Sequence, residues 1–196
     1  MVTVPRDDGS LMAQVQLGDI EALGELYRRY KKRVYRTALA ITHDESLAED
    51  ILQETFVRVY KYAESFDQTQ PFEPWLYRMT VNLTYSWLNR AKRWVHFFQD
   101  TLEHLKLPSW LNPETMVEDR EEKDRLCRAV NGLTDSHRAI IVLFYIEELS
   151  VEEISYALKI PEGTVKSRLY YARKKLKKAI KNQDNELLSE VIYEIA

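Results

Sequence analysis

The residues whose types and spacing most clearly indicate a chemical role form a basic block at positions 163–181. Eight Lys and Arg side chains and no Asp or Glu occur in these 19 residues. Val165, Leu169, Ala172 and Leu176 recur in the same segment at helical spacing, so it also has an apolar face. A helix that packs one face and presents cations on the other is suited to binding a polyanion such as nucleic acid. The alternative is a solvated helix face, but such faces usually mix both charge signs.

The residues before this block predict a helix-turn-helix. Ser150 and Glu153 form a capping box that opens a short helix, and Lys-Ile-Pro-Glu-Gly at 159–163 supplies the turn. The second helix then presents polar side chains that can enter a DNA major groove. Its N-terminal half is expected to reach base edges through Lys166, Ser167 and Tyr170. The later cations are expected to contact phosphates, which position a protein without specifying sequence; they are Arg173, Lys174, Lys177 and Lys178.

The rest of the chain predicts an all-α protein of two small helical domains joined by a linker. Asp19 and Asp44 are expected N-caps, and Pro71 and Pro74 mark the start of a third long helix that continues to Trp94. We expect a helical bundle at 10–95, a linker at 96–113, a helix-turn-helix domain at 114–181 and an amphipathic tail at 182–196. The second domain is expected to contain helices at about 114–131, 135–147, 150–158 and 162–181.

Composition narrows the class of protein. The chain has 196 residues, a formal net charge of −3 and 45% hydrophobic residues, which excludes a uniformly basic histone-like protein. Its single cysteine, Cys127, excludes an intramolecular disulfide and a cysteine-based zinc site. The longest purely apolar run is far shorter than the ~20 residues of a spanning helix, and no signal pattern opens the chain. We therefore expect a cytoplasmic protein with no membrane insertion of its own.

Three stretches resemble an extracytoplasmic-function (ECF) bacterial sigma factor. EEISYALKIPEGTVKSRL at 152–169 is similar to region 4 of that family. AEDILQETFVRVY at 48–60 resembles its region 2 helix that binds polymerase, and FEPWLYRMTVNLTYSWLNRAKR at 72–93 resembles its promoter-melting helix. The resemblance covers about residues 10–181 and keeps the family order. It implies a subunit that binds core RNA polymerase, recognises the minus-35 and minus-10 promoter elements and initiates transcription.

The resemblance also assigns roles to individual residues. Contact with the β′ clamp helices of core polymerase is implied for Asp50, Gln53 and Glu54. Recognition of the minus-10 element is implied for Phe66, Asp67, Asn82, Ser86, Asn89, Arg90 and Arg93. Recognition of the minus-35 duplex is implied for Thr164, Lys166, Ser167, Tyr170 and Tyr171. The implied partners are core RNA polymerase (its β′ clamp helices and β flap), promoter DNA and an anti-sigma factor.

Two other classes of protein are alternatives to the sigma-factor hypothesis. One is a stand-alone helix-turn-helix regulator, which the AEDILQETF stretch argues against. The other is a di-metal carboxylate enzyme, but the chain has no Glu-x-x-His, HExxH, P-loop or GxSxG motif. We therefore expect no catalytic residue, no metal and no cofactor. The sequence leaves open whether the tail is a lid or a regulator-binding segment. It equally leaves open whether a second basic block is a solvated face or a contact surface; this block is Arg28, Arg29, Lys31, Lys32, Arg33 and Arg36.

Overall fold

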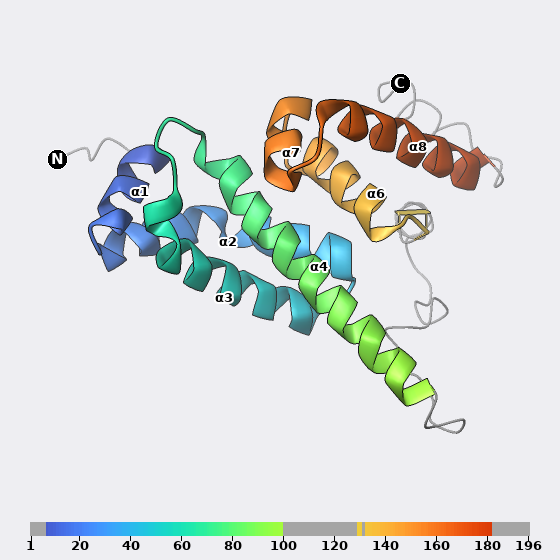
Figure 1. Cartoon of the computed structure of the whole chain (residues 1–196), viewed down its shortest axis with the longest axis horizontal. Helices are drawn as coiled ribbons and strands as arrows, with labels where there is room; N and C mark the ends of the chain where they lie inside the picture. Colours follow the sequence, from blue (N-terminus) through green and yellow to red (C-terminus); the bar gives the residue numbers. More distant parts are fainter. Residues whose placement is uncertain (1–6, 100–128, 131, 182–196) are drawn as a thin grey trace.

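A computed structural model describes residues 7–99, 129–130 and 132–181, and these residues form helices without a strand (Figure 1). The predicted all-α, two-domain class is confirmed. The N-terminal half contains four α-helices and a short 3₁₀-helix: α1 (Asp8–Gln16), α2 (Ile20–Thr42), α3 (Glu45–Lys61), η1 (Ala63–Ser65) and α4 (Phe72–Gln99). The C-terminal half contains α6 (Asp135–Ile141), the π-helix η3 (Val142–Ile146), α7 (Val151–Leu158) and α8 (Glu162–Lys181).

The predicted N-caps of the two long helices are confirmed. The Asp19 carboxylate accepts from the backbone N–H of Glu21 at 2.8 Å, and Asp44 accepts from that of Leu47 at 2.9 Å. These bonds satisfy N–H groups that the first turn of a helix leaves without partners. The sequence pattern did not indicate α1, a nine-residue helix capped by Asp7, because so short a segment shows little periodicity.

Helices α1 to α4 pack around their own apolar core. Leu11 of α1, Leu26 of α2, Phe56 of α3 and Leu76 of α4 are all buried in one cluster. A second cluster of Ala38, Ala48, Ile51 and Leu83 joins α2, α3 and α4. The N-terminal half therefore contains buried clusters that include no residue of the C-terminal half, apart from the partly buried Tyr156 at the edge of the first.

The C-terminal half has the predicted helix-turn-helix. The capping box is present, because the Ser150 hydroxyl accepts from the Glu153 backbone N–H at 3.1 Å and the Glu153 carboxylate accepts from the Ser150 backbone N–H at 2.8 Å. Lys159 ends α7 in the left-handed region at φ 53°, which turns the chain towards α8. The helix expected at 135–147 is divided: α6 ends at Ile141 and continues as η3.

The two halves pack against each other (Figure 1). Ile41 of α2 and Tyr77 and Val81 of α4 belong to the same buried cluster as Leu143 and Val165 of the C-terminal half. Arg138 of α6 reaches across this contact and donates to the carbonyl of Ile41 at 2.6 Å. The linker was expected at 96–113, but α4 continues to Gln99 because no Pro or Gly interrupts the helix there. The remainder of that segment, the helix expected at 114–131 apart from its last residues, Cys127 and the tail lie outside the described residues.

Candidate nucleic-acid interface

Helix α8 has one buried and one exposed face. Val165 and Ala172 are fully buried and Leu169 is 4% exposed, as the apolar stripe predicts. On the other side, Tyr170 and Tyr171 are 60% and 57% exposed. Of the remaining residues predicted to contact the minus-35 element, Thr164 and Arg173 are half-buried and five are exposed: Lys166, Ser167, Lys174, Lys177 and Lys178. Large exposed aromatic rings beside cations are suited to contact with nucleic acid rather than with the core.

The exposed side chains in the N-terminal turns of α8 make only weak interactions with their own helix. The Lys166 Nζ lies 3.2 Å from Glu162 Oε2, in a pair in which both side chains are more than half exposed. Such a surface pair contributes little and is readily exchanged for a contact with DNA. The Ser167 hydroxyl donates to the carbonyl of Thr164 at 3.0 Å, and its oxygen can still accept a hydrogen bond.

Arg173 differs from the other predicted phosphate contacts. Its Nε donates to the Tyr145 hydroxyl at 2.7 Å. Its guanidinium also lies 5.4 Å from the ring centre of Phe144 and 5.6 Å from that of Tyr145. These contacts join α8 to η3, so Arg173 supports the position of α8 within the C-terminal half.

Helix α4 exposes a strip of polar side chains. Asn82, Ser86, Asn89 and Arg90 are all exposed, and the Arg90 guanidinium lies 5.1 Å from the ring centre of Trp87. The side chain of Arg93, which belongs to the same helix, lies outside the described side chains. The strip places amide and hydroxyl groups, which can read a base edge, next to an aromatic ring and a cation.

Phe66 and Asp67 have different environments in the loop before α4. The ring of Phe66 is only 4% exposed and packs edge-on against Phe72 and Trp75, so in this structure it is a core residue. Asp67 is exposed, and its carboxylate accepts from the hydroxyl and the backbone N–H of Thr69. These hydrogen bonds lower the pKa of Asp67 below its ordinary value and keep the carboxylate charged.

A groove of about 490 Å³ lies between α3 and α4. Its lining includes all three residues predicted to bind polymerase and two of those predicted to bind the minus-10 element: Asp50, Gln53, Glu54, Ser86 and Arg90. Within the groove, Arg58 Nε lies 2.9 Å from Glu54 Oε1. The structure therefore brings the two predicted sets together on one surface, although they come from separate helices.

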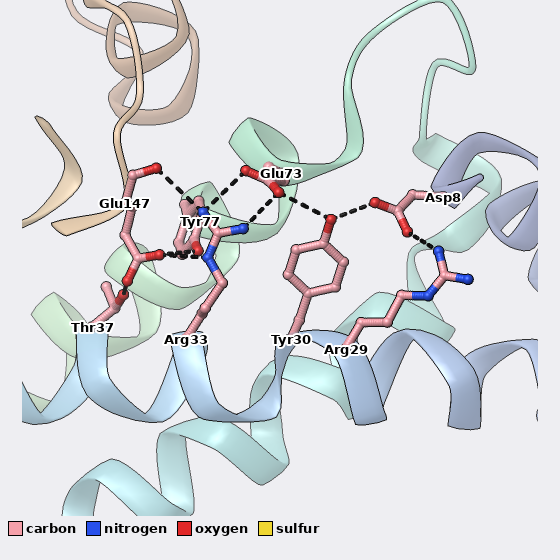
Figure 2. Close-up of polar contacts among 8 residues, drawn as sticks. All are labelled: Asp8, Arg29, Tyr30, Arg33, Thr37, Glu73, Tyr77 and Glu147. Carbon is pink, nitrogen blue, oxygen red and sulfur yellow. Dashed lines mark hydrogen bonds and ion pairs between the residues drawn. The ribbon is translucent and has the colours of Figure 1, made fainter. Parts of the chain in front are cut away.

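The structure contains a buried polar network that the sequence did not predict (Figure 2). The side chain of Glu147, which follows η3, is fully buried and accepts from Arg33 Nε at 2.9 Å and from the Thr37 hydroxyl at 2.6 Å. The Tyr77 hydroxyl also donates to it, and Arg33 Nη2 donates to its main-chain carbonyl at 3.2 Å. Burial raises the pKa of Tyr77 above its ordinary value, and the bond to Glu147 raises it further, so the hydroxyl stays a donor.

The network includes part of the second basic block, and the structure gives two of its arginines partners within the chain. Arg33 also pairs with Glu73 at 2.7 Å, and Arg29 pairs with Asp8 at 2.8 Å (Figure 2). Arg29 pairs with Glu25 of its own helix as well. These two of its six cations therefore have partners within the chain. The other four cations of the block are exposed, so whether they form a contact surface stays open. A signal for Glu147 did exist, because its carboxylate follows the apolar run Ala139–Ile146 and would be costly to bury unpaired.

The fold and α8 define a helical DNA-binding protein, and comparison with known proteins supplies its family. Residues 26–94 match the family model described as Sigma-70 region 2, and residues 129–178 match Sigma-70, region 4. The chain is 33% identical over 176 residues to the ECF RNA polymerase sigma factor SigW of Bacillus subtilis, covering 86% of this chain and 94% of the relative. It is 34% identical over 155 residues to SigM of the same organism, covering 79% and 93%.

Solved structures share the fold. CnrH in complex with the cytosolic domain of CnrY matches with a TM-score of 0.67 at 24% identity, covering 90% of this chain and 99% of that one. The sigma factor RpoE of Bartonella quintana, in complex with the anti-sigma factor NepR, matches with a TM-score of 0.68 at 20% identity, covering 84% and 100%.

This chain belongs to the ECF group of sigma-70 family RNA polymerase sigma factors. It binds core RNA polymerase, recognises the minus-35 and minus-10 promoter elements and initiates transcription. The stand-alone regulator is not favoured, because the region 2 match has no place in that hypothesis. Within the described part of the chain, no helix is both long and apolar enough to cross a membrane.

Proposed function

We propose that α8 binds the minus-35 element as a duplex, with its N-terminal half in the major groove. The observation that carries this proposal is the two-sided character of α8: Val165 and Ala172 are buried while Lys166, Ser167 and Tyr170 are exposed. Lys166 and Ser167 supply hydrogen-bond groups for base edges, and the tyrosine rings supply apolar contact. Lys174 and Lys177 contact phosphates further along the helix.

The minus-10 element is proposed to bind along α4 and the loop before it. The exposed strip of Asn82, Ser86 and Asn89 reads bases of the opened strand, while Arg90 and Arg93 hold its phosphates. Asp67 contributes a carboxylate that can accept from an exocyclic amino group of a base. Phe66 supports this loop from the core, since its ring is buried between Phe72 and Trp75.

The polymerase contact is proposed to lie on α3, at Asp50, Gln53 and Glu54. These side chains line one wall of the groove whose other wall carries Ser86 and Arg90. Two acids and an amide suit a partner helix that presents arginines. Because the groove joins the two sites, docking on the β′ clamp helices would place the opened strand directly beside the polymerase.

The chain is proposed to have no catalytic activity of its own, since nucleotidyl transfer belongs to the polymerase, and to act in the cytoplasm where polymerase works. An anti-sigma factor is proposed as a further partner. The sigma factor RpoE, which shares this fold, was solved in complex with the anti-sigma factor NepR, and CnrH, which also shares it, was solved with the cytosolic domain of CnrY.

The test is run-off transcription with purified bacterial core polymerase and a library of genomic promoters. Lys166→Ala is expected to reduce specific transcripts about fivefold or more and leave core binding unchanged, since a good base contact contributes about 1–3 kcal/mol. Lys175→Ala is the matched control, because nine residues turn a helix through about 900° and so place this exposed lysine on the other side of α8. Loss of core binding in Lys166→Ala would contradict the proposal.

A second variant tests the polymerase contact. Asp50→Ala combined with Gln53→Ala is expected to weaken core binding at least tenfold, because truncating charged interface groups typically costs 2 kcal/mol or more. Glu64→Ala removes an exposed acid from η1 and serves as the control. Core affinity equal to that of the unmodified chain would refute the role of α3, and it is measured by fluorescence anisotropy of labelled sigma factor titrated with core.

A further inference from the structure

In the described network, the side chain of Glu147 is hydrogen-bonded only across the contact between the two halves. Its own main chain belongs to the C-terminal half, whereas Arg33, Thr37 and Tyr77 belong to α2 and α4 (Figure 2). Its side chain has no exposed surface. A carboxylate in such a place is stable only while its hydrogen bonds are made. The Glu147 side chain therefore has these hydrogen-bond partners only when the halves are in contact.

The partners do not need Glu147 in the same way. Arg33 keeps a two-pronged pair with Glu73, in which Nη1 and Nη2 lie 2.7 and 3.3 Å from the two carboxylate oxygens. Separation of the halves would leave that pair intact. The polar groups of Glu147, Thr37 and Tyr77 would then become exposed and form hydrogen bonds with water. The network can thus open without leaving a buried charge unpaired, which distinguishes it from a salt bridge inside a single core.

The backbone before Glu147 is built to aim it at α2. The Glu147 N–H donates to the carbonyl of Val142 at 3.1 Å, five residues back, so the turn is wider than an α-helical turn. Glu148 then takes a φ of 57°, a conformation that is unfavourable for a residue with a side chain. Together they direct Glu147 inwards and Glu148 into solvent.

The closed arrangement conflicts with the geometry of a promoter. Elements centred near minus-35 and minus-10 are about 25 base pairs apart, or about 85 Å at about 3.4 Å per base pair. A compact chain of this length has a radius of gyration of only about 16 Å. While Tyr77 and Val81 share one buried cluster with Leu143 and Val165, α4 and α8 cannot reach both elements.

We propose that Glu147, with Arg33, Thr37 and Tyr77, is a latch that holds the sigma factor closed and must release before the chain spans a promoter. The latch rests on the proposed assignment of α4 and α8 to the two elements. Glu147→Gln weakens it, because the amide keeps one acceptor oxygen for three donor groups and brings two N–H groups of its own. Glu148→Gln makes the same chemical change at the neighbouring exposed residue and is the control.

Opening is measured in the full chain by the labelling rate of an introduced thiol, after Cys127→Ser removes the native one. Val81→Cys reports separation of the halves, because Val81 is buried in the shared cluster. Ala48→Cys reports unfolding of the N-terminal half, because its cluster contains only residues of α2, α3 and α4. Glu147→Gln is expected to speed labelling at position 81 at least tenfold and to leave position 48 within twofold.

Several outcomes decide the proposal. Equal rates for Glu147→Gln and Glu148→Gln at position 81 would overturn the latch, as would an equal acceleration at positions 48 and 81, which would report unfolding instead. Thr37→Val and Tyr77→Phe each remove one hydroxyl that donates to Glu147 and nearly preserve side-chain shape, so each should accelerate position 81 by a smaller factor. No acceleration in either would also overturn it.

A transcription assay separates the latch from the function on which it rests. At limiting sigma factor, Glu147→Gln is expected to raise the yield of promoter complexes, because apparent affinity scales with the fraction of chains that are open. Faster labelling without any gain in promoter complexes would overturn the claim that opening limits promoter binding. If the unmodified chain directs no transcription with core polymerase, the proposed function fails, and the labelling rates alone decide whether the latch exists.

Discussion

Arg173 and Lys174 are adjacent cations on α8, and the sequence predicted that both contact phosphate. The structure predicts instead that their substitution will have different effects. Arg173 is half-buried, and its guanidinium lies against Phe144 and Tyr145. Lys174 is exposed. We therefore expect Arg173→Ala to lower the free energy of unfolding with little effect on the salt dependence of promoter binding, and Lys174→Ala to do the reverse.

The magnitudes follow from the contacts. The hydrogen bond from Arg173 Nε to the Tyr145 hydroxyl contributes about 1 kcal/mol, and each cation–π contact at a partly exposed site about 0.5 kcal/mol. Arg173→Ala should thus lower the free energy of unfolding by about 2 kcal/mol. Tyr145→Phe, which removes only the hydroxyl, should lower it by about half as much. Lys174→Ala should change it by less than about 0.5 kcal/mol, as is usual for an exposed residue.

Two assays separate the variants. Urea unfolding followed by circular dichroism gives the stability, and filter binding of the polymerase holoenzyme to a promoter between low and moderate salt gives the slope of log affinity against log salt. Loss of one phosphate contact should reduce that slope by about 0.9, so Lys174→Ala should show this change. A normal stability for Arg173→Ala together with a reduced slope would show that Arg173 contacts phosphate and would refute the reasoning.

Two further predictions concern stability. His43 is an exposed residue, but desolvation by the groups packed around its ring and the nearby charge of Arg138 lower its pKa from 6.5 to about 4. The unfolded chain therefore binds the proton more readily, and stability should fall as pH drops from 6.5 towards 4. His43→Asn, which tolerates the left-handed backbone at this position, should flatten that fall in urea titrations at pH 5 and 7, and an unchanged pH dependence would contradict the assignment to His43. The Thr55 hydroxyl is buried and has no hydrogen-bond partner among the described residues, so Thr55→Val should raise the free energy of unfolding by about 1 kcal/mol, whereas a decrease would show that the hydroxyl is satisfied in solution.

Local signals predicted much of the fold. Asp19, Asp44 and Ser150 were identified as helix caps from residue type and position, and each accepts a backbone N–H as expected. The apolar stripe of α8 is buried for the same reason, since a period of 3.6 residues fixes which side chains share a face. Such features depend on a few neighbouring residues, and the sequence contains them completely.

Features that depend on packing between distant segments were not predicted. The resemblance placed Phe66 among the residues of minus-10 recognition, and the sequence did not indicate that its ring lies in an aromatic cluster with Phe72 and Trp75, which only the fold of the loop brings together. The division of 135–147 into α6 and η3 leaves almost no sign in the periodicity, because a π turn changes the register by a single residue. Glu147 and Arg33 are 114 residues apart, and no local pattern pairs them.

Helix α4 shows why closure and DNA binding can be controlled separately. Tyr77, Val81 and Tyr85 face the C-terminal half, and the Tyr85 hydroxyl donates to the carbonyl of Asp135 at 3.4 Å. Asn82, Ser86 and Asn89 are exposed on the same helix even though the halves are together. The closed form therefore leaves the proposed minus-10 surface exposed. It prevents simultaneous binding of both promoter elements because it holds α4 and α8 too close together. A latch of this kind discriminates between a single element and a complete promoter, because only binding to both elements requires the contact at Glu147 to open.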